Sequence, residues 1–92
     1  MGDLENRVIV VIGGTGGLGL SAVRACLRHA GRVVAVGRDA GRVREVQAEL
    51  GDGVSCLAGD AMDPATAPRA IERALEVFGR FDGLYQVAGG SG

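Results

Sequence analysis

Five glycines lie within seven residues of this 92-residue chain, in the stretch GGTGGLG that runs from Gly13 to Gly19. A glycine inside a helix or strand costs roughly 0.5–1 kcal/mol relative to alanine, so such a cluster needs a special reason. It follows an apolar run, Val8 to Ile12, and precedes a segment with helical spacing. Where a strand turns into a helix, the first N–H groups are unpaired and carry a partial positive charge that favours a phosphate. The glycines therefore indicate a phosphate-binding turn.

Three spacings of these glycines fit variants of the dinucleotide-binding fingerprint. They are Gly14-x-Gly16-x-x-Gly19, Gly13-x-x-Gly16-x-x-Gly19 and Gly13-x-x-x-Gly17-x-Gly19. In each of them glycine lets the backbone turn sharply, approach a pyrophosphate closely and pack the helix against the strand. A glycine-rich connection that binds nothing is the alternative, and the flanking strand and helix favour the binding turn.

A basic residue follows the next apolar run and bears on the choice of cofactor. An acidic residue at this point would accept hydrogen bonds from ribose hydroxyls and indicate NAD. The chain has Arg38 instead, the only basic group that we expect near the end of this strand, and arginine is suited to hold a ribose 2′-phosphate and stack on adenine. We interpret the neighbouring Asp39 as a helix N-cap. The sequence therefore predicts NADP(H), with NAD(H) as the less favoured cofactor.

The elements that must position these residues alternate along the chain. Short β-branched runs predict strands at Arg7–Ile12, Arg32–Gly37, Val54–Ala58 and Gly83–Ala88. Amphipathic segments predict helices at Gly17–Ala30, from the Asp39 cap to near Gly51, and from an Asp63-Pro64 start to Gly79. The order βαβαβαβ predicts an α/β fold, a partial Rossmann-type doubly wound parallel sheet with strand order 3-2-1-4.

Composition and charge exclude several other classes of function. The net charge of −1 gives no reason to expect a nucleic acid or an anionic membrane as partner. The longest apolar run, Val8 to Ile12, is far shorter than the ~20 residues that a membrane span needs. The acidic N-terminus lacks an apolar signal core, so we expect a cytoplasmic protein. Cys26 and Cys56 lie in predicted buried elements, without metal-binding spacing, and are interpreted as small buried hydrophobic residues.

With these motifs in place, the chain resembles the short-chain dehydrogenases/reductases over nearly its whole length. VIGGTGGLGL looks like the family's T-G-x-x-x-G-x-G turn, with Ile12 where threonine is usual. GDAMDP is similar to the D-V-(T/S)-(D/N) stretch that lies against adenine, and FGRFDGLYQVAGG resembles F-G-x-(L/I)-D-x-L-V-N-N-A-G, with Gln86 in place of the first asparagine. The cofactor-binding residues that this resemblance implies are Gly13, Thr15, Gly16, Gly17, Leu18, Gly19, Arg38, Asp60, Ala61, Ala88 and Gly89.

The resemblance also implies hydride transfer between NADP(H) and a carbonyl or alcohol, with a Tyr-x-x-x-Lys pair as the acid–base centre. This chain has no lysine, and Tyr85, its only tyrosine, is interpreted as a packing residue. We therefore expect residues 1–92 to be the N-terminal, cofactor-binding half of a Rossmann domain, inactive and marginally stable alone. We expect the fourth strand to be an exposed edge, and the full-length protein to be a homo-oligomer.

Two other interpretations remain open. One is a non-catalytic module that binds a dinucleotide without turning it over. The other, which Gly37-Arg38 disfavours, is a fragment of an S-adenosylmethionine-dependent methyltransferase, because such enzymes need an acidic residue at the end of the second strand. The substrate is not encoded in these residues.

Overall fold

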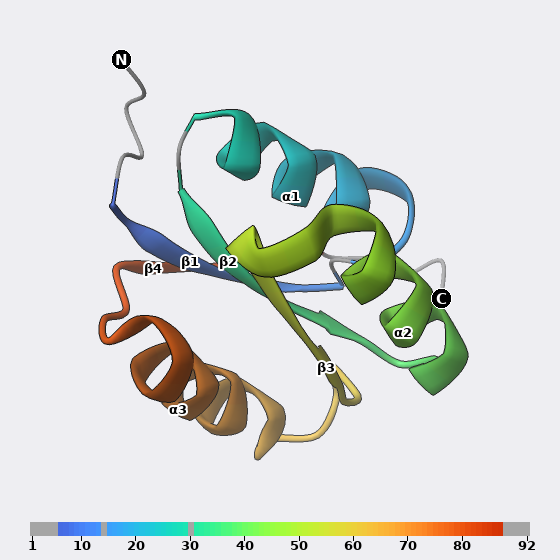
Figure 1. Cartoon of the computed structure of the whole chain (residues 1–92). Coiled ribbons are helices and arrows are strands. Elements are labelled where there is room, and N and C mark those ends of the chain that lie inside the picture. Colours follow the sequence, from blue (N-terminus) through green and yellow to red (C-terminus); the bar gives the residue numbers. More distant parts are fainter. Residues whose placement is uncertain (1–5, 14, 30, 88–92) are drawn as a thin grey trace.

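Four parallel strands form a sheet in the computed structural model, which describes residues 6–13, 15–29 and 31–87 (Figure 1). The strands are β1 (Val8–Ile12), β2 (Arg32–Gly37), β3 (Val54–Ala58) and β4 (Gly83–Gln86). The helices are α1 (Gly17–Arg28), α2 (Ala40–Leu50) and α3 (Thr66–Phe78), with a 3-10 turn at Gly51–Gly53. The strand order is β3-β2-β1-β4 and every neighbouring pair is parallel, so the predicted topology is confirmed.

Apolar side chains fill a layer on each face of the sheet. Alternate residues of β1 and β2, Val8, Val10, Ile12, Val34 and Val36, pack with Ala70 and Ala74 of α3. The residues between them, Val11, Val33 and Ala35, pack with Val23 of α1 and Val54 of β3. Figure 1 shows α3 on one face and α1 with α2 on the other. Because both faces of β1 and β2 are covered, their nearly unbroken valine runs are as expected for central parallel strands.

The start of α3 differs from the prediction. Asp63 and Pro64 do not begin the helix, which starts at Thr66. The Asp63 carboxylate instead accepts a hydrogen bond from the Ala65 N–H at 2.9 Å. The backbone carbonyl of Asp63 accepts one from the Thr66 N–H at 3.0 Å. The Asp-Pro pair thus closes a separate turn, because the buried Thr66 hydroxyl donates to the Asp60 carbonyl at 2.6 Å and fixes where the helix begins.

The strand β4 is an edge of the described sheet, as predicted. Its described neighbour is β1, and its side chains Leu84 and Tyr85 are 41% and 51% exposed. The interpretation of Tyr85 as a packing residue is therefore wrong for this structure. Tyr85 is in register with Val11, on the face where α1 packs, but α1 lies over β1 and β2 and leaves the Tyr85 side chain exposed. The Val87 N–H still donates to the Ile12 carbonyl at 3.0 Å beyond the strand's end. The predicted last residue of this strand, Ala88, lies outside the described residues.

At the opposite edge, a glutamine of α2 takes the place of a further strand. The Gln47 amide nitrogen donates to the Val54 carbonyl at 2.8 Å, and its oxygen accepts from the Cys56 N–H at 2.8 Å. These two backbone groups of β3 face away from β2, on the side where another strand would pair. Unpaired edge groups invite association with other chains, and the Gln47 side chain satisfies them from within the molecule.

The entry into β4 is held to β1 by one aspartate. The Val8 N–H donates to the Asp82 carboxylate at 2.7 Å, while the Asp82 N–H donates to the Val8 carbonyl at 2.9 Å. The Arg80 guanidinium donates twice to the same carboxylate, at 2.8 and 2.7 Å. The hydrogen bonds from Arg80 and from Val8 lower the pKa of Asp82 below its ordinary value. The ionised form of this carboxylate is therefore favoured by folding.

We predict that Asp82→Asn lowers the urea midpoint of unfolding at pH 7. Because the pKa of Asp82 is lower in the folded chain than in the unfolded one, its contribution is complete above the unfolded value of about 4. That contribution is lost as the pH falls through the folded value. The wild-type and variant midpoints should therefore converge below pH ~4, as urea titrations at a series of pH values would show. Asp52→Asn, in the exposed 3-10 turn, is the control, and a gap that stays constant with pH would contradict the prediction.

Candidate functional site

The turn between β1 and α1 contains two glycines with left-handed backbone conformations, Gly13 (φ 90°) and Gly17 (φ 53°). The Gly13 N–H donates to the Val36 carbonyl over 2.8 Å, which ties the start of the turn to β2. A Cβ at Gly13 would lie 3.2 Å from the Cβ of Val87, just beyond β4. Glycine is thus required at position 13, both because of the positive φ angle there and because the backbone lies close to the chain after β4.

The rest of the turn leads directly into the first helix. Gly16 is the N-cap residue of α1 and has no side chain to bond the helix's first N–H groups. Gly17 and Leu18 follow as the first exposed helical residues, and Gly19 is buried. The spacing Gly13-x-x-x-Gly17-x-Gly19 is the one in which each glycine has either a left-handed φ or a buried position. Gly14, which one alternative spacing uses, lies outside the described residues.

Thr15 joins the glycine turn to the end of β2. Its side chain is buried, with 8% of the residue exposed, and stands directly against Gly37. A Cβ at Gly37 would lie 2.0 Å from the Thr15 hydroxyl oxygen and 2.8 Å from its Cβ, closer than real Cβ contacts allow. The sequence analysis did not identify Gly37 as a site residue. Its only signal was a glycine at the end of an otherwise β-branched strand, which indicates close approach of another part of the chain.

A second arginine reaches the turn from α2. The Arg42 Nε–H donates to the Thr15 carbonyl at 3.0 Å, and a terminal nitrogen of Arg42 pairs with Glu45 at 3.3 Å. The expectation that Arg38 is the only basic group near the end of the second strand is therefore wrong. Arg42 lies four residues after Arg38, in the first turn of α2, and its side chain reaches the Thr15 carbonyl.

Arg38 and Asp39 are adjacent in the chain but lie in different environments, as the sequence suggested. Arg38 is exposed directly after β2. The Asp39 carboxylate accepts hydrogen bonds from the N–H groups of Gly41, at 2.9 Å, and Arg42, at 3.3 Å. Asp39 is thus the N-cap of α2, and Arg38 is left as the charged side chain at this strand end.

Asp60 and Ala61 follow β3 in a compact turn. The Asp60 carboxylate accepts a hydrogen bond from the Met62 N–H at 2.9 Å, and its carbonyl accepts the Thr66 hydroxyl. The Gly59 N–H donates to the Gly37 carbonyl at 2.8 Å, so this turn is anchored beside the end of β2. These bonds fix Asp60 and Ala61 close to the strand end that carries Arg38.

A hollow of about 870 Å³ brings these turns together at the carboxyl ends of the strands. The predicted residues that line it are Gly13, Thr15, Gly16, Gly17, Leu18, Arg38, Asp60 and Ala61. Gly19 is buried beneath the turn and does not line it, and Ala88 and Gly89 lie outside the described residues. Further lining residues that the sequence did not indicate are Gly59 and Met62 after β3, Gln86 at the end of β4 and Val87 just beyond it.

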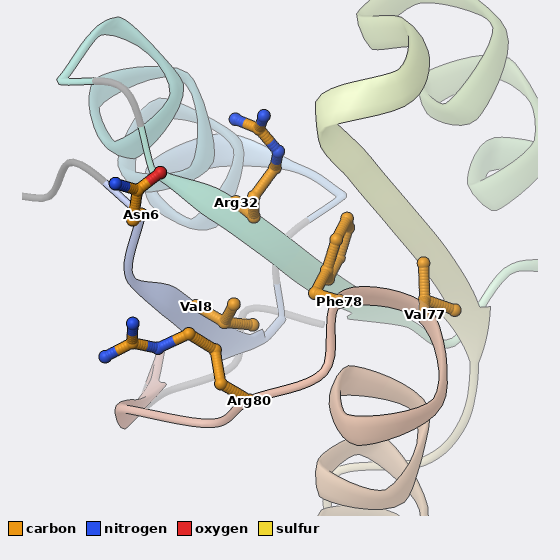
Figure 2. A pocket seen from close by; sticks show the side chains of 6 residues that line it. All are labelled: Asn6, Val8, Arg32, Val77, Phe78 and Arg80. Atoms are coloured by element: carbon orange, nitrogen blue, oxygen red, sulfur yellow. The ribbon is translucent and has the colours of Figure 1, made fainter.

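A smaller hollow of about 370 Å³ lies near the amino ends of β1 and β2 (Figure 2). Its floor is apolar, with Val8 and Phe78, and it carries none of the predicted site residues. Arg80 is paired with Asp82, and Figure 2 shows the guanidinium groups of Arg32 and Arg80 pointing in different directions. The larger hollow is therefore the candidate site.

The two thiols lie apart from this site. Cys26 and Cys56 are free and half-buried, and burial raises the pKa of both thiols. Neither residue lines the larger hollow. Within the described ranges there is no cluster of three histidine, cysteine or acidic residues that could hold a metal, and no helix long and apolar enough to cross a membrane.

Comparisons with known proteins point to one family. The family model described as short chain dehydrogenase matches residues 7–92. A cis-2,3-dihydrobiphenyl-2,3-diol dehydrogenase from Pseudomonas sp. (strain KKS102) is 34% identical over 87 residues, which make up 95% of this chain and 32% of that protein. The short-chain dehydrogenase reductase 3b of Arabidopsis thaliana is 28% identical over 95 residues, covering 94% of this chain and 34% of that protein. The chain thus spans about a third of the length of the curated relatives it matches.

Solved structures agree with the sequence matches. A 3-ketoacyl-(acyl-carrier-protein) reductase from Brucella melitensis, complexed with NADH, is 32% identical, with a TM-score of 0.81. The match covers 89% of this chain and 34% of that chain. A short-chain dehydrogenase/reductase from the same organism also has a TM-score of 0.81 at 26% identity, over 90% of this chain and 36% of the other.

The contact between Thr15 and Gly37 generates a stability prediction. Gly37→Ala places a Cβ where the Thr15 side chain stands, so the turn or β2 must shift, and overpacking of this kind costs about 1–3 kcal/mol. Gly16→Ala is the matched control, because that residue has an extended backbone and nothing within 4 Å of a new Cβ. Urea unfolding should show a large loss for Gly37→Ala and a small one for Gly16→Ala. Equal losses would show that the contact is not a steric constraint.

Proposed function

The chain belongs to the short-chain dehydrogenases, a family of oxidoreductases that use NAD(H) or NADP(H), and on this premise we propose that its larger hollow binds NADP(H). One observation carries the proposal. The glycine turn, Arg38, and the Asp60–Ala61 pair come from three separate strand ends and line the same hollow. A dinucleotide needs sites for a pyrophosphate, a ribose and a base within one cleft, and these three groups supply them.

The glycine turn is the proposed pyrophosphate site. Gly16, Gly17 and Leu18 line the hollow at the start of α1, where the helix's first N–H groups and positive dipole end favour an anion. A Cβ at Gly13 would press on Val87, so the turn can take this close path only with glycine. The buried Gly19 lets α1 pack against the sheet behind it. The residues present therefore fit a pyrophosphate.

The adenosine half is assigned to the ends of β2 and β3. Arg38 is exposed on the rim, where its guanidinium can pair with a ribose 2′-phosphate, and this residue supports NADP(H) over NAD(H). Asp60 and Ala61 lie beside it and are the proposed adenine contacts. The Brucella reductase in the comparison is complexed with NADH. The proposed preference of this chain for NADP(H) is therefore inferred from Arg38 and not from that relative. Ala88 and Gly89 are proposed to flank the nicotinamide half.

In catalysis the bound dinucleotide supplies or accepts a hydride. The residues of this chain are proposed to bind and orient it, and transfer to or from a carbonyl or alcohol substrate requires further groups. The Tyr-x-x-x-Lys pair of the family is absent, since the chain has no lysine and Tyr85 is followed by Gln86, Val87, Ala88 and Gly89. We therefore propose that residues 1–92 act as the cofactor-binding half of a Rossmann domain. Homo-oligomerisation of the full-length protein stays a prediction.

The cofactor preference is tested by replacing Arg38. In the full-length protein, Arg38→Asp should weaken NADPH binding by about ten- to a hundredfold, since a charge-assisted hydrogen bond contributes roughly 1.5–3 kcal/mol. NADH binding should change little or improve, so the preference should reverse. Fluorescence titration of both nucleotides against both proteins measures this directly.

The control is Arg44→Asp, which makes the same change of charge at an exposed position on α2. Equal affinity of the wild-type protein for both cofactors would contradict the NADP(H) preference alone. Absence of binding to either cofactor would contradict the proposed function as a whole.

A further inference from the structure

Arg42 touches the glycine turn without lining the hollow. Its Nε–H donates to the Thr15 carbonyl in a partly buried hydrogen bond of 3.0 Å. The lining of the hollow includes Thr15, Arg38 and Asp39 but not Arg42, which therefore lies behind the turn. Arg38, in contrast, lines the hollow.

The hydrogen bond fixes the orientation of one peptide unit. In a trans peptide the carbonyl and the following N–H point in opposite directions, and the described chain has no cis peptides. Since the Thr15 carbonyl points toward Arg42 on α2, the Gly16 N–H must point away from α2. Gly16 lines the hollow and is the N-cap of α1. Arg42 thus sets the direction of a backbone donor at the proposed pyrophosphate site.

The Thr15–Gly16 peptide needs such a restraint because the backbone hydrogen bonds at Gly16 act on the next peptide, whose carbonyl accepts from the Gly19 and Leu20 N–H groups at 3.1 and 3.4 Å. Rotation of the Thr15–Gly16 peptide changes the φ angle of Gly16, and glycine tolerates almost any φ. A Cβ at Gly16 would meet nothing within 4 Å, so no packing holds it in place. The Thr15 side chain is locked against Gly37, which fixes the Cα–Cβ direction but leaves rotation about the Thr15 Cα–C bond, and so the direction of its carbonyl, open.

Arg42 is itself held from two directions. Its backbone N–H donates to the Asp39 cap at 3.3 Å, which fixes the first turn of α2. Its guanidinium also pairs with Glu45, one turn along the same helix, at 3.3 Å. Both restraints leave the Nε–H aimed at the Thr15 carbonyl.

We propose that Arg42 is a positioning residue for cofactor binding, which orients the Gly16 N–H toward the pyrophosphate through its hydrogen bond to the Thr15 carbonyl. The proposal rests on the proposed function of the hollow. Because NADH and NADPH share the pyrophosphate, Arg42 should contribute equally to the affinity for both. Arg38 should contribute to NADPH alone.

The test uses two variants that differ in one donor. Glutamine carries an N–H at the same number of bonds from Cα as the arginine Nε, while methionine has a similar length and no donor. Both keep the helix propensity of arginine. Arg42→Met should weaken NADH and NADPH binding by the same factor, about three- to tenfold for a net hydrogen bond, and Arg42→Gln should restore most of it. Arg44→Met, at an exposed position on α2, is the control and should change neither.

A second measurement needs no cofactor. In amide spectra of the ¹⁵N-labelled chain, the Gly16 resonance should move in Arg42→Met, return toward its original position in Arg42→Gln, and stay unchanged in Arg44→Met. A general loss of stability would shift the urea midpoint without this pattern.

Several outcomes would overturn the proposal. Loss of NADPH affinity alone in Arg42→Met would make Arg42 a direct phosphate ligand, and unchanged affinity for both would remove its role. A Gly16 resonance that does not move would overturn the positioning step even if the wild-type chain binds no dinucleotide, a result that by itself contradicts only the proposed function.

Discussion

The close contact between the glycine turn and β2 is the constraint on which the candidate site depends. Thr15 occupies the space that any side chain at residue 37 would need, and Gly13 donates to the Val36 carbonyl beside it. These two contacts set the direction in which the chain leaves β1 and enters α1. They also place Arg38, the next residue after Gly37, at the edge of the turn. The hollow exists because β1 and β2 end together and the turn folds over them.

The strand order explains why the hollow opens at this end of β1. The chain runs from β1 through α1 to β2 on one side, and from β3 through α3 to β4 on the other. The helices that flank β1, α1 and α3, therefore lie on opposite faces of the sheet, as Figure 1 shows. This is the switch point at which open α/β sheets bind their ligands. At the amino end, Asp82 holds β1 and β4 together with paired backbone and side-chain bonds.

Much of this arrangement could be predicted from the sequence because its signals are local. Unbroken valine runs identify covered parallel strands, and the cap at Asp39 marks the start of α2. Clustered glycines at a strand end identify the turn, and the alternation of elements gives the strand order. Each of these features depends on neighbouring residues, or on a topology that few alternatives satisfy.

The predictions that were wrong depend on contacts, or on the absence of contacts, that the local sequence pattern does not show. Arg42 is 27 positions from Thr15, and nothing in a charged helical stretch indicates that one arginine folds back onto a distant carbonyl. The α3 helix starts at Thr66, later than the Asp-Pro pair indicates, and the hydroxyl of Thr66 bonds the Asp60 carbonyl in a contact that the local pattern does not show. Tyr85 is exposed although its strand has an apolar pattern, because that pattern does not reveal that the described helices leave both faces of β4 partly open, with Leu84 on one face and Tyr85 on the other.

Arg38, just before α2, and Arg42, in its first turn, have different proposed roles in cofactor binding, and their positions in the fold explain the difference. Arg38 lies on the rim and meets solvent, so a change in its side chain leaves the contacts of Thr15 and Gly37 intact. Arg42 lies behind the turn, where it touches backbone that every dinucleotide would share. In the proposed assignment, selectivity between cofactors depends on Arg38, which the turn does not need, while overall affinity depends on Arg42, which does not line the hollow. Separate sites for the two properties allow cofactor preference to change without rebuilding the turn.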